Sequence, residues 1–268
     1  MSTYSFEQWL AAAEQQPELP EHLPDWLRPV VEMARSGDMY EQQRKVPKEG
    51  VDGTPPRYSA VLVLPGEAPE AAEASAAGDP PATILLTHRA PSMRTHSGQM
   101  AFPGGARESQ DSGPIATALR EANEETGLDP DSVEPVALIR PLYIDRTNFA
   151  VVPVLAYWRQ PHPVHPATTE NDWVQPLPLS ELTDPDKRFL VECGPWHGPA
   201  FYVDKMVLWG FTGGVVNELL KCAGWERPWD KQRKVDLFTA LEKSANGEAL
   251  SDMWDSFRGE FEGELNQE

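Results

Sequence analysis

The chain has 268 residues and a formal net charge of −19, with 42 acidic side chains against 23 Lys and Arg. This excess of carboxylates argues against nucleic acid as a partner, because binding to a phosphate backbone needs clustered Lys and Arg. The chain contains no apolar run of about 18 residues, and its first residues lack a basic region followed by an apolar one, so we predict a cytoplasmic protein without a membrane segment.

Residues 1–56 are predicted to form an N-terminal helical extension. Residues 5–16 and 25–36 have helical patterns, and a polar stretch containing Pro and Gly follows at 37–56. Two roles are open for this extension: a cap on the domain that follows, or the contact surface of a homodimer.

Two apolar strands are predicted next, from Arg57 to Leu64 and from Thr83 to Arg89. The stretch between them, residues 65–82, is rich in Ala, Glu and Pro. Such a composition offers too little apolar surface to offset the entropy lost on ordering. We therefore predict a mobile loop at 65–82.

A helix is predicted from Pro114 to Thr126. Ser112 or Gly113 is the expected N-cap, Pro114 suits the first helical position, and Gly127 stands just past the end. Four apolar residues at i, i+3, i+4 and i+7 form a stripe that packs on a core: Ile115, Ala118, Leu119 and Ala122.

The remaining chain mixes strands and helices. Strands are expected at 133–144, 149–158, 189–193 and 200–203, with a hairpin connection at 145–148 and a proline-rich segment at 161–178. Helices are expected at 179–182, 205–222 and 235–243, and an acidic, weakly ordered tail from about Gly247. Cys193 and Cys222 lack metal-ligand spacing, so we expect thiols rather than a disulfide.

Three glutamates share one arc of the predicted 114–126 helix: Glu121, Glu124 and Glu125 stand at i, i+3 and i+4. Like charges at these spacings cost about 0.2–0.5 kcal/mol per pair. Anions near a helix C-terminus cost about 0.3–1 kcal/mol more. A bound cation would offset both costs, whereas the alternative interpretation is a solvated acidic face.

Upstream of this helix, Phe102-Pro103-Gly104-Gly105 has the pattern of a strand ending in a tight glycine turn, where the backbone can approach a ligand closely. Together with residues 119–128, LREANEETGL, this block resembles the Nudix box: a glycine, a variable loop, then Arg-Glu-aliphatic-any-Glu-Glu-any-Gly-aliphatic. One departure is Asp111, which replaces the usual glutamate of the first half, with one extra residue between it and Arg120.

Residues 96–105, HSGQMAFPGG, and 117–122, TALREA, resemble more narrowly the coenzyme A pyrophosphatase branch of the Nudix hydrolases. The resemblance implies hydrolysis of the pyrophosphate bond of coenzyme A or acyl-coenzyme A, giving 3',5'-ADP and 4'-phosphopantetheine or its acyl form. Two alternatives remain open. One is a Nudix enzyme for another nucleoside diphosphate derivative, such as ADP-ribose or a dinucleotide, and the other is a catalytically silent, nucleotide-binding Nudix domain.

The same resemblance assigns roles to residues of the block. It implies that Glu121 and Glu125 hold Mg²⁺ or Mn²⁺, that Glu124 is a further ligand or the base, and that the Gly105 carbonyl adds an oxygen. Arg120 would orient the carboxylates. Magnesium suits an all-oxygen set of ligands and keeps several waters, and Asp111 either reaches the metal through water or is a plain loop residue.

Cations near the box are candidates for binding a polyanionic nucleotide. Arg89, Arg94 and His96 are the predicted substrate-binding residues, with Arg140 and Arg146 as further candidates. The resemblance implies an α/β fold, a Nudix α/β/α sandwich with a mixed sheet, over residues 57–225. Residues 226–268 are expected to add a C-terminal helix and the acidic tail.

Overall fold

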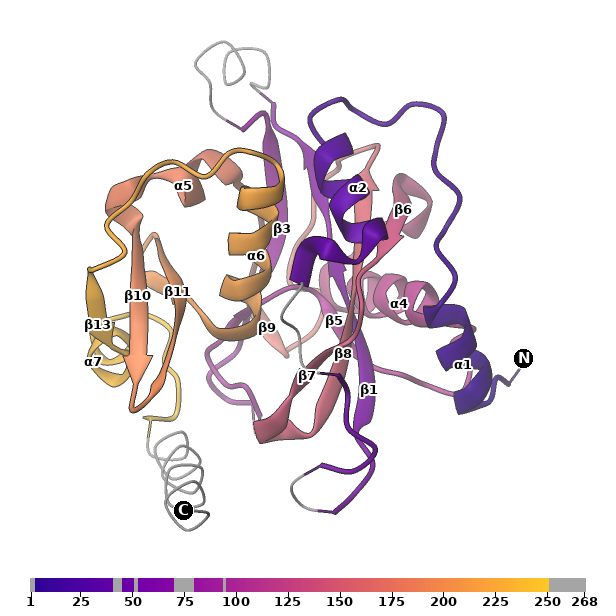
Figure 1. Ribbon diagram of the computed structural model, residues 1–268, viewed down its shortest axis with the longest axis horizontal. Coiled ribbons are helices and arrows are strands. Elements are labelled where there is room, and N and C mark those ends of the chain that lie inside the picture. Colours follow the sequence, from indigo (N-terminus) through magenta and orange to yellow (C-terminus); the bar gives the residue numbers. More distant parts are fainter. Residues whose placement is uncertain (1–2, 41–44, 51–52, 70–79, 94, 251–268) are drawn as a thin grey trace.

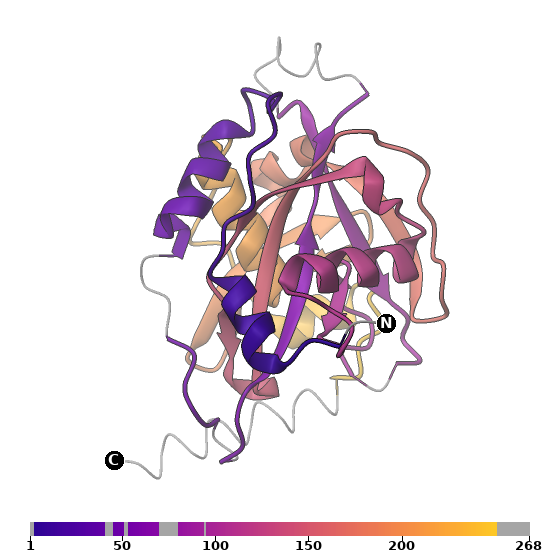
Figure 2. The same ribbon diagram turned by 90° about the vertical axis from the view of Figure 1, so that its right-hand side faces the viewer.

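The computed structural model describes residues 3–40, 45–50, 53–69, 80–93 and 95–250. Among these residues, nine strands form one mixed sheet with helices on both faces (Figures 1 and 2). Its strands are β1 (Arg57–Val63), β2 (Pro65–Glu67), β3 (Ala82–Arg89), β4 (Met100–Ala101), β5 (Gly104–Ala106), β6 (Val133–Leu138), β7 (Leu142–Ile144), β8 (Phe149–Trp158) and β9 (Asn171–Pro178). The order is β4-β3-β2-β8-β1-β5, with β6 and β7 paired to β8 and β9 paired to β3. This architecture confirms the predicted α/β/α sandwich.

Strand β8 is the centre of a two-sided core. It runs parallel to β1 and antiparallel to β6 and β7. Successive side chains of a strand point to opposite faces, so Val152 and Val154 enter one apolar cluster while Leu155 and Tyr157 enter the other. Burial on both faces explains why the sequence of β8 is an almost continuous apolar run.

Helices cover the two faces of this sheet. On one face, α1 (Phe6–Ala13) and α4 (Pro114–Thr126) pack through Trp9, Ala118 and Ala122, which are fully buried. On the other face lie α2 (Arg28–Ser36) and α6 (Gly210–Cys222). The short helix α5 (Leu179–Thr183) follows β9. The N-terminal helices are thus part of both apolar cores.

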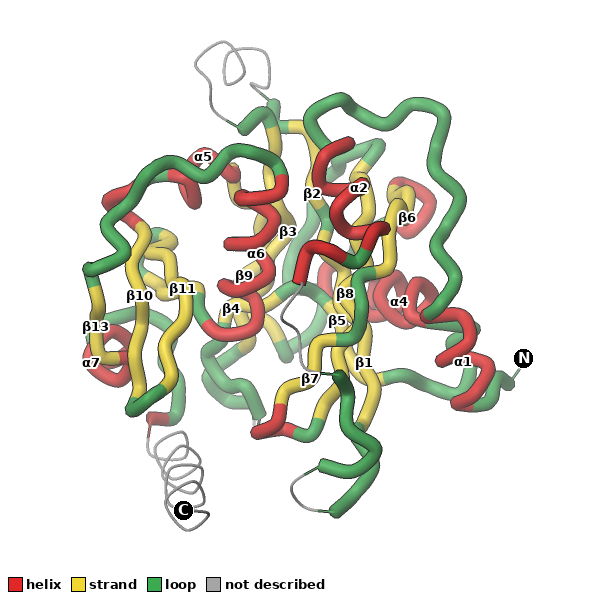
Figure 3. The backbone as a smooth tube through the Cα atoms, viewed as in Figure 1, coloured by secondary structure: helices red, strands yellow, loops and turns green. Residues whose placement is uncertain are grey.

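A second, four-stranded sheet lies beside the first (Figure 3). Two of its strands were predicted, at 189–193 and 200–203, but the sheet itself was not. It consists of β10 (Arg188–Cys193), β11 (Trp196–Val203), β12 (Met206–Leu208) and β13 (Lys234–Asp236), with α7 (Leu237–Glu242) packed against it. Two predicted helices therefore begin later than expected. Residues 206–208 belong to β12 instead of the 205–222 helix, and residues 234–236 belong to β13 instead of the 235–243 helix.

Three other segments differ from their predicted secondary structure. The proline-rich segment 161–178 contains strand β9, which pairs antiparallel with β3. A strand paired on one side tolerates proline, since an outward-facing N–H is not needed. The expected strand 133–144 is divided into β6 and β7, and Pro141 lies between them. Residues 65–67 of the predicted mobile loop form β2, whereas residues 70–79 lie outside the described residues.

Residues 247–250 are placed against the domain, so the expected weakly ordered tail does not begin at Gly247, and residues 251–268 lie outside the described part. Cys193 and Cys222 are free thiols, as predicted. Across the described ranges, no helix is both long and apolar enough to cross a membrane.

Because Trp9 is fully buried against α4 and β1, we predict that Trp9→Ala lowers the free energy of unfolding by about 3–5 kcal/mol, the cost of a large cavity. Urea denaturation monitored by circular dichroism measures the change. Leu19→Ala is the control: Leu19 is 49% exposed, and its loss should change stability by less than about 0.5 kcal/mol. A Trp9→Ala effect as small as that of the control would show that the extension is a separate unit.

Candidate active site

Helix α4 begins and ends where local signals place it. It spans Pro114–Thr126 with Gly113 as its N-cap, as predicted. Gly127 ends the helix in the left-handed region, at φ 69°, and a Cβ there would lie 3.0 Å from the His165 ring. Glycine adopts this conformation without steric cost, so the last turn, which carries the glutamates, has a fixed end.

The three glutamates of α4 face different surroundings. Glu125 is buried and its carboxylate accepts a hydrogen bond from the Gly104 N–H (3.1 Å). Glu121 is half-buried beside Gly105, where an added Cβ would lie 2.5 Å from its carboxyl carbon. The Glu124 side chain is 53% exposed. Glycines in β5 thus allow two carboxylates, not three, to approach the strand backbone.

Burial makes these two carboxylates costly to ionise. Burial raises the pKa of Glu125 to about 7, although the Gly104 N–H and Arg89 oppose the shift. Burial also raises the pKa of Glu121, against the effect of Arg120. A nearby cation would lower both values. The Arg89 guanidinium is 3.7 Å from Glu125, too far for a hydrogen bond.

The surroundings of Glu121 and Glu125 fit a divalent cation. Within the described residues, no three His, Cys, Asp or Glu side chains are grouped closely enough to hold a metal ion. Magnesium, however, needs only one or two protein carboxylates, because it keeps several waters. Two desolvated carboxylates beside a glycine backbone supply oxygen ligands and a negative charge that a cation would neutralise.

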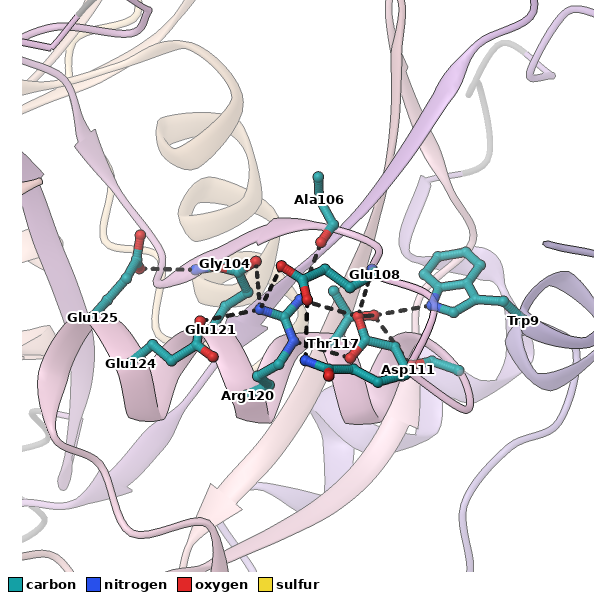
Figure 4. Close-up of polar contacts among 12 residues, drawn as sticks. Trp9, Gly104, Ala106, Glu108, Asp111, Thr117, Arg120, Glu121, Glu124 and Glu125 are labelled. Carbon is teal, nitrogen blue, oxygen red and sulfur yellow. Dashed lines mark hydrogen bonds and ion pairs between the residues drawn. The ribbon is translucent and has the colours of Figure 1, made fainter. Parts of the chain in front are cut away.

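Arg120 connects the parts of this site through all five of its N–H groups (Figure 4). Nε and Nη2 donate to the two oxygens of Asp111, each at 3.0 Å, in a bidentate ion pair. Nη1 donates to Glu121 (3.0 Å) and Glu124 (3.1 Å), and Nη2 also donates to the Ala106 carbonyl (3.1 Å). Arg120 therefore positions other groups and has no N–H left for a substrate.

A hydrogen-bond chain reaches this ion pair from the N-terminal helix (Figure 4). The Trp9 Nε1–H donates to Thr117 Oγ1 (2.9 Å), and the Thr117 hydroxyl donates to Asp111 Oδ2 (2.9 Å). The Glu108 N–H donates to the same oxygen at 2.8 Å. Burial raises the pKa of Asp111, but the hydrogen bonds from Arg120, Glu108 and Thr117 outweigh it, so the pKa lies below its usual value.

Of the predicted substrate-binding residues, Arg89 lies near the carboxylates and His96 lies within the electrostatic reach of Arg89. Arg89 lies between Glu125 and Glu170, with Nη2 3.6 Å from Glu170. His96 is exposed, and Arg89 and Arg146 both act on it electrostatically. Arg94 lies outside the described residues. Arg140 is directed elsewhere: its guanidinium packs on Gly37 at the end of α2.

Comparison with known proteins identifies the family. A model of the NUDIX domain matches residues 74–196. The chain is 35% identical over 149 residues to the Nudix hydrolase NudL of Citrobacter koseri, covering 51% of this chain and 72% of that relative. It is 37% identical over 141 residues to NudL of Enterobacter sp. strain 638, with the same coverage. The chain belongs to the Nudix hydrolases.

A Nudix hydrolase is a pyrophosphohydrolase of nucleoside diphosphate derivatives that uses divalent metal ions, so the alternative of a catalytically silent domain is set aside. The mixed sheet and its helices are the Nudix fold. Among solved structures, the crystal structure of the Nudix hydrolase RenU from M. smegmatis is similar, with 24% identity and a TM-score of 0.37, over 51% of this chain and 81% of that chain.

Several residues of this candidate site were missed by sequence analysis. Trp9 and Thr117 support Asp111, Glu170 pairs with Arg89, and Glu248 contacts the turn that holds His96, through Gln99. Trp9 and Glu248 lie far from the box in the sequence, so no spacing rule could have linked them to it. Of these residues, only Thr117 lies within a motif recognised in the sequence, TALREA at 117–122. Its hydroxyl, near the start of the helix, was the one indication of a polar contact there.

We predict that Asp111→Asn lowers the free energy of unfolding by about 3–5 kcal/mol, because it leaves the half-buried Arg120 without its bidentate partner. Since the pKa of Asp111 is lowered in the folded state, this contribution exists above the unfolded pKa and disappears as pH falls through the folded pKa. Urea denaturation of both proteins from neutral to acidic pH measures the difference.

Asp25→Asn is the control for this experiment. Asp25 pairs with Arg28, but its side chain is 98% exposed, so the variant should change stability by less than about 1 kcal/mol at any pH. Equal effects of the two substitutions would contradict the structural role given to Asp111.

Proposed function

We propose that the protein hydrolyses the pyrophosphate bond of coenzyme A or acyl-coenzyme A, giving 3',5'-ADP and 4'-phosphopantetheine or its acyl form, with Mg²⁺ or Mn²⁺. The observation that carries this proposal is the link between the HSGQ turn and the carboxylates. The Arg89 N–H donates to the Gln99 carbonyl (2.9 Å), and the Arg89 guanidinium approaches Glu125. The motif that resembles the coenzyme A branch therefore borders the candidate metal site.

In this proposal, Glu121, Glu125 and the Gly105 carbonyl hold the ion, and Glu124 is a further ligand or the base. When bound, a divalent cation makes a coordinated water more acidic and neutralises charge on the bridging phosphate oxygens. The exposed position of Glu124 suits a base, since its carboxylate is open to solvent while Arg120 fixes one of its oxygens. Glu124 would accept the proton of the attacking water, whose oxygen would form a bond to phosphorus while the bridging P–O bond of the anhydride breaks and the other phosphate leaves.

The cations near Glu125 have a separate role in this proposal. Coenzyme A is a polyanion, and a chain of net charge −19 needs local positive charge to bind it. Arg89 supplies that charge together with Arg146. His96, on which both arginines act electrostatically, would also contact the substrate. We assign the Nudix domain to residues 57–225, with extensions at 1–56 and 226–268. The cytoplasmic location and the homodimer stay predictions.

The alternative substrate is another nucleoside diphosphate derivative, such as ADP-ribose or a dinucleotide. Both classes contain the pyrophosphate group that the carboxylate site would process. They differ in the 3'-phosphate, which coenzyme A has and ADP-ribose lacks. Cations that pair with this group would be left without a partner by a substrate lacking it.

We predict that Glu125→Gln lowers divalent-dependent turnover by about two to three orders of magnitude. A neutral amide no longer holds the cation, and the cation stabilises the charge of the transition state by several kcal/mol. Mn²⁺ affinity, measured by electron paramagnetic resonance, should fall as well. The metal-free variant should be at least as stable as the wild type, since the buried carboxylate has a raised pKa. Glu242→Gln, an exposed position on α7, is the control, and equal turnover in both variants would refute the assignment.

The substrate prediction is a ranking of kcat/KM at fixed Mg²⁺. We expect coenzyme A to exceed its 3'-dephospho form, and both to exceed ADP-ribose, because the 3'-phosphate adds charge-assisted hydrogen bonds to the cations. Chromatography of the products should show 3',5'-ADP. Efficient hydrolysis of ADP-ribose or a dinucleotide without turnover of coenzyme A would select the alternative.

A further inference from the structure

The turn at residues 96–99 is held by backbone hydrogen bonds to Arg89. The Gly98 N–H donates to the Arg89 carbonyl (3.0 Å), and the Arg89 N–H donates to the Gln99 carbonyl (2.9 Å). Gly98 has φ 71° and His96 has φ 54°, both in the left-handed region. A non-glycine residue in this region needs outside support to stay there, and the support comes from the other end of the chain.

The C-terminal strap, residues 244–250, packs directly on this turn. Asn246 is fully buried, and its side-chain amide pairs with Val207 of β12 as a neighbouring strand would. It accepts from the Val207 N–H (2.7 Å) and donates to the Val207 carbonyl (3.0 Å). The same amide donates to the Gly98 carbonyl (3.0 Å). A Cβ on Gly98 would lie 2.4 Å from the Asn246 carbonyl oxygen, so only glycine fits between turn and strap.

His88 joins the same two segments from the sheet. Its buried ring has Nε2 3.1 Å from both the Gly98 carbonyl and the Asn246 carbonyl, so a proton on this nitrogen is shared between turn and strap. Its Nδ1 lies beside the Asp172 carboxylate. The strap is therefore fixed relative to β3, and its next side chain, Glu248, has a defined position.

A chain of three side chains runs from Glu248 to His96. Glu248 Oε1 accepts from the Trp209 Nε1–H (2.8 Å) and lies 3.2 Å from the Asn246 side-chain nitrogen. Glu248 Oε2 accepts from Gln99 Nε2 (3.3 Å). Gln99 Oε1 in turn lies 3.0 Å from His96 Nδ1. The strap thus reaches a predicted substrate-binding residue.

The direction of every hydrogen bond in this chain follows from Glu248. An ionised carboxylate only accepts, so Gln99 turns its NH₂ group toward Glu248 and its oxygen toward His96. His96 must then carry its proton on Nδ1, which leaves a lone pair on Nε2. Partial burial of the ring lowers the pKa of His96, the hydrogen bond to Gln99 opposes this shift, and Arg89 and Arg146 lower the pKa further, so the net effect favours the neutral ring. Its Nε2 has no hydrogen-bond partner among the described residues, and the side chain is exposed.

We propose that Glu248 is a positioning residue that, through Gln99, fixes His96 in the Nδ1–H tautomer and presents Nε2 to the substrate as a hydrogen-bond acceptor. An acceptor recognises an N–H or O–H group, such as an amide, an amino group or a hydroxyl, and it repels a phosphate oxygen. Phosphate contacts then fall to Arg89 and Arg146. This inference rests on the proposed nucleotide-hydrolase site, but not on coenzyme A being its substrate.

Glu248→Gln tests the proposal because it keeps the shape and reverses the polarity. The Trp209 indole can only donate, so it holds the new amide oxygen, and the new NH₂ group faces Gln99. Gln99 must rotate, and its own NH₂ group then donates to His96 Nδ1. We expect ¹⁵N spectra of the ring at about pH 8, where Glu248 (pKa raised to about 7 by burial) is ionised in the wild type, to show Nδ1–H in the wild type and Nε2–H in the variant.

Kinetics supply the second readout. Losing one acceptor should raise KM about 2- to 10-fold in Glu248→Gln with little change in kcat. In a His96→Ala background the same substitution should add no further change in KM. Glu242→Gln, an exposed acidic position near the strap, is the matched control and should leave both the spectra and KM unchanged.

The outcomes separate this inference from the proposed substrate. The spectra need no substrate, and KM is measured with whichever nucleoside diphosphate derivative the wild type hydrolyses. Failure with coenzyme A alone overturns the proposed function only. An unchanged His96 tautomer in Glu248→Gln, or an unchanged KM, overturns the positioning role of Glu248.

Discussion

The site depends on the ion pair between Arg120 and Asp111. This pair is the meeting point of the loop after β5, the body of α4 and, through Thr117, the N-terminal helix. Each of the five Arg120 N–H groups has an oxygen acceptor, which offsets the cost of removing a guanidinium from water. Arg120, fixed in this way, holds Glu121 and Glu124 in place. Their carboxylates, together with that of Glu125, form a region of negative charge.

The carboxylates of this region are placed where a cation would stabilise them. Two carboxylates are desolvated against the glycines of β5, and burial raises the pKa of each. Arg89 approaches Glu125 without forming a short contact. In a protein with many more acidic than basic residues, the positive charge near the site comes from a few arginines. The two desolvated carboxylates therefore carry negative charge that the nearby arginines balance only in part.

Both ends of the chain contribute to a site whose motif occupies the middle. Trp9 reaches Asp111 through Thr117, and the C-terminal strap reaches His96 through Glu248 and Gln99. In the first chain the donor-only indole N–H of Trp9 fixes the direction of the hydrogen bonds, and in the second chain the acceptor-only carboxylate of Glu248 does so. Extensions outside the matched 74–196 region thus act on the geometry of that region.

Local chemistry in the sequence determined helix α4, because proline at its first position and a left-handed glycine after its end act within one turn of chain. It also determined β8, whose apolar run is buried on both faces. The box itself was visible as a motif. Only the tertiary structure decided that Glu125 is buried while the adjacent Glu124 is exposed, since a 100° step between neighbours separates the two faces once β5 packs against the helix. It also decided the pairing of β9 and the contacts of Glu248, because partners distant in the sequence meet only when the sheets assemble.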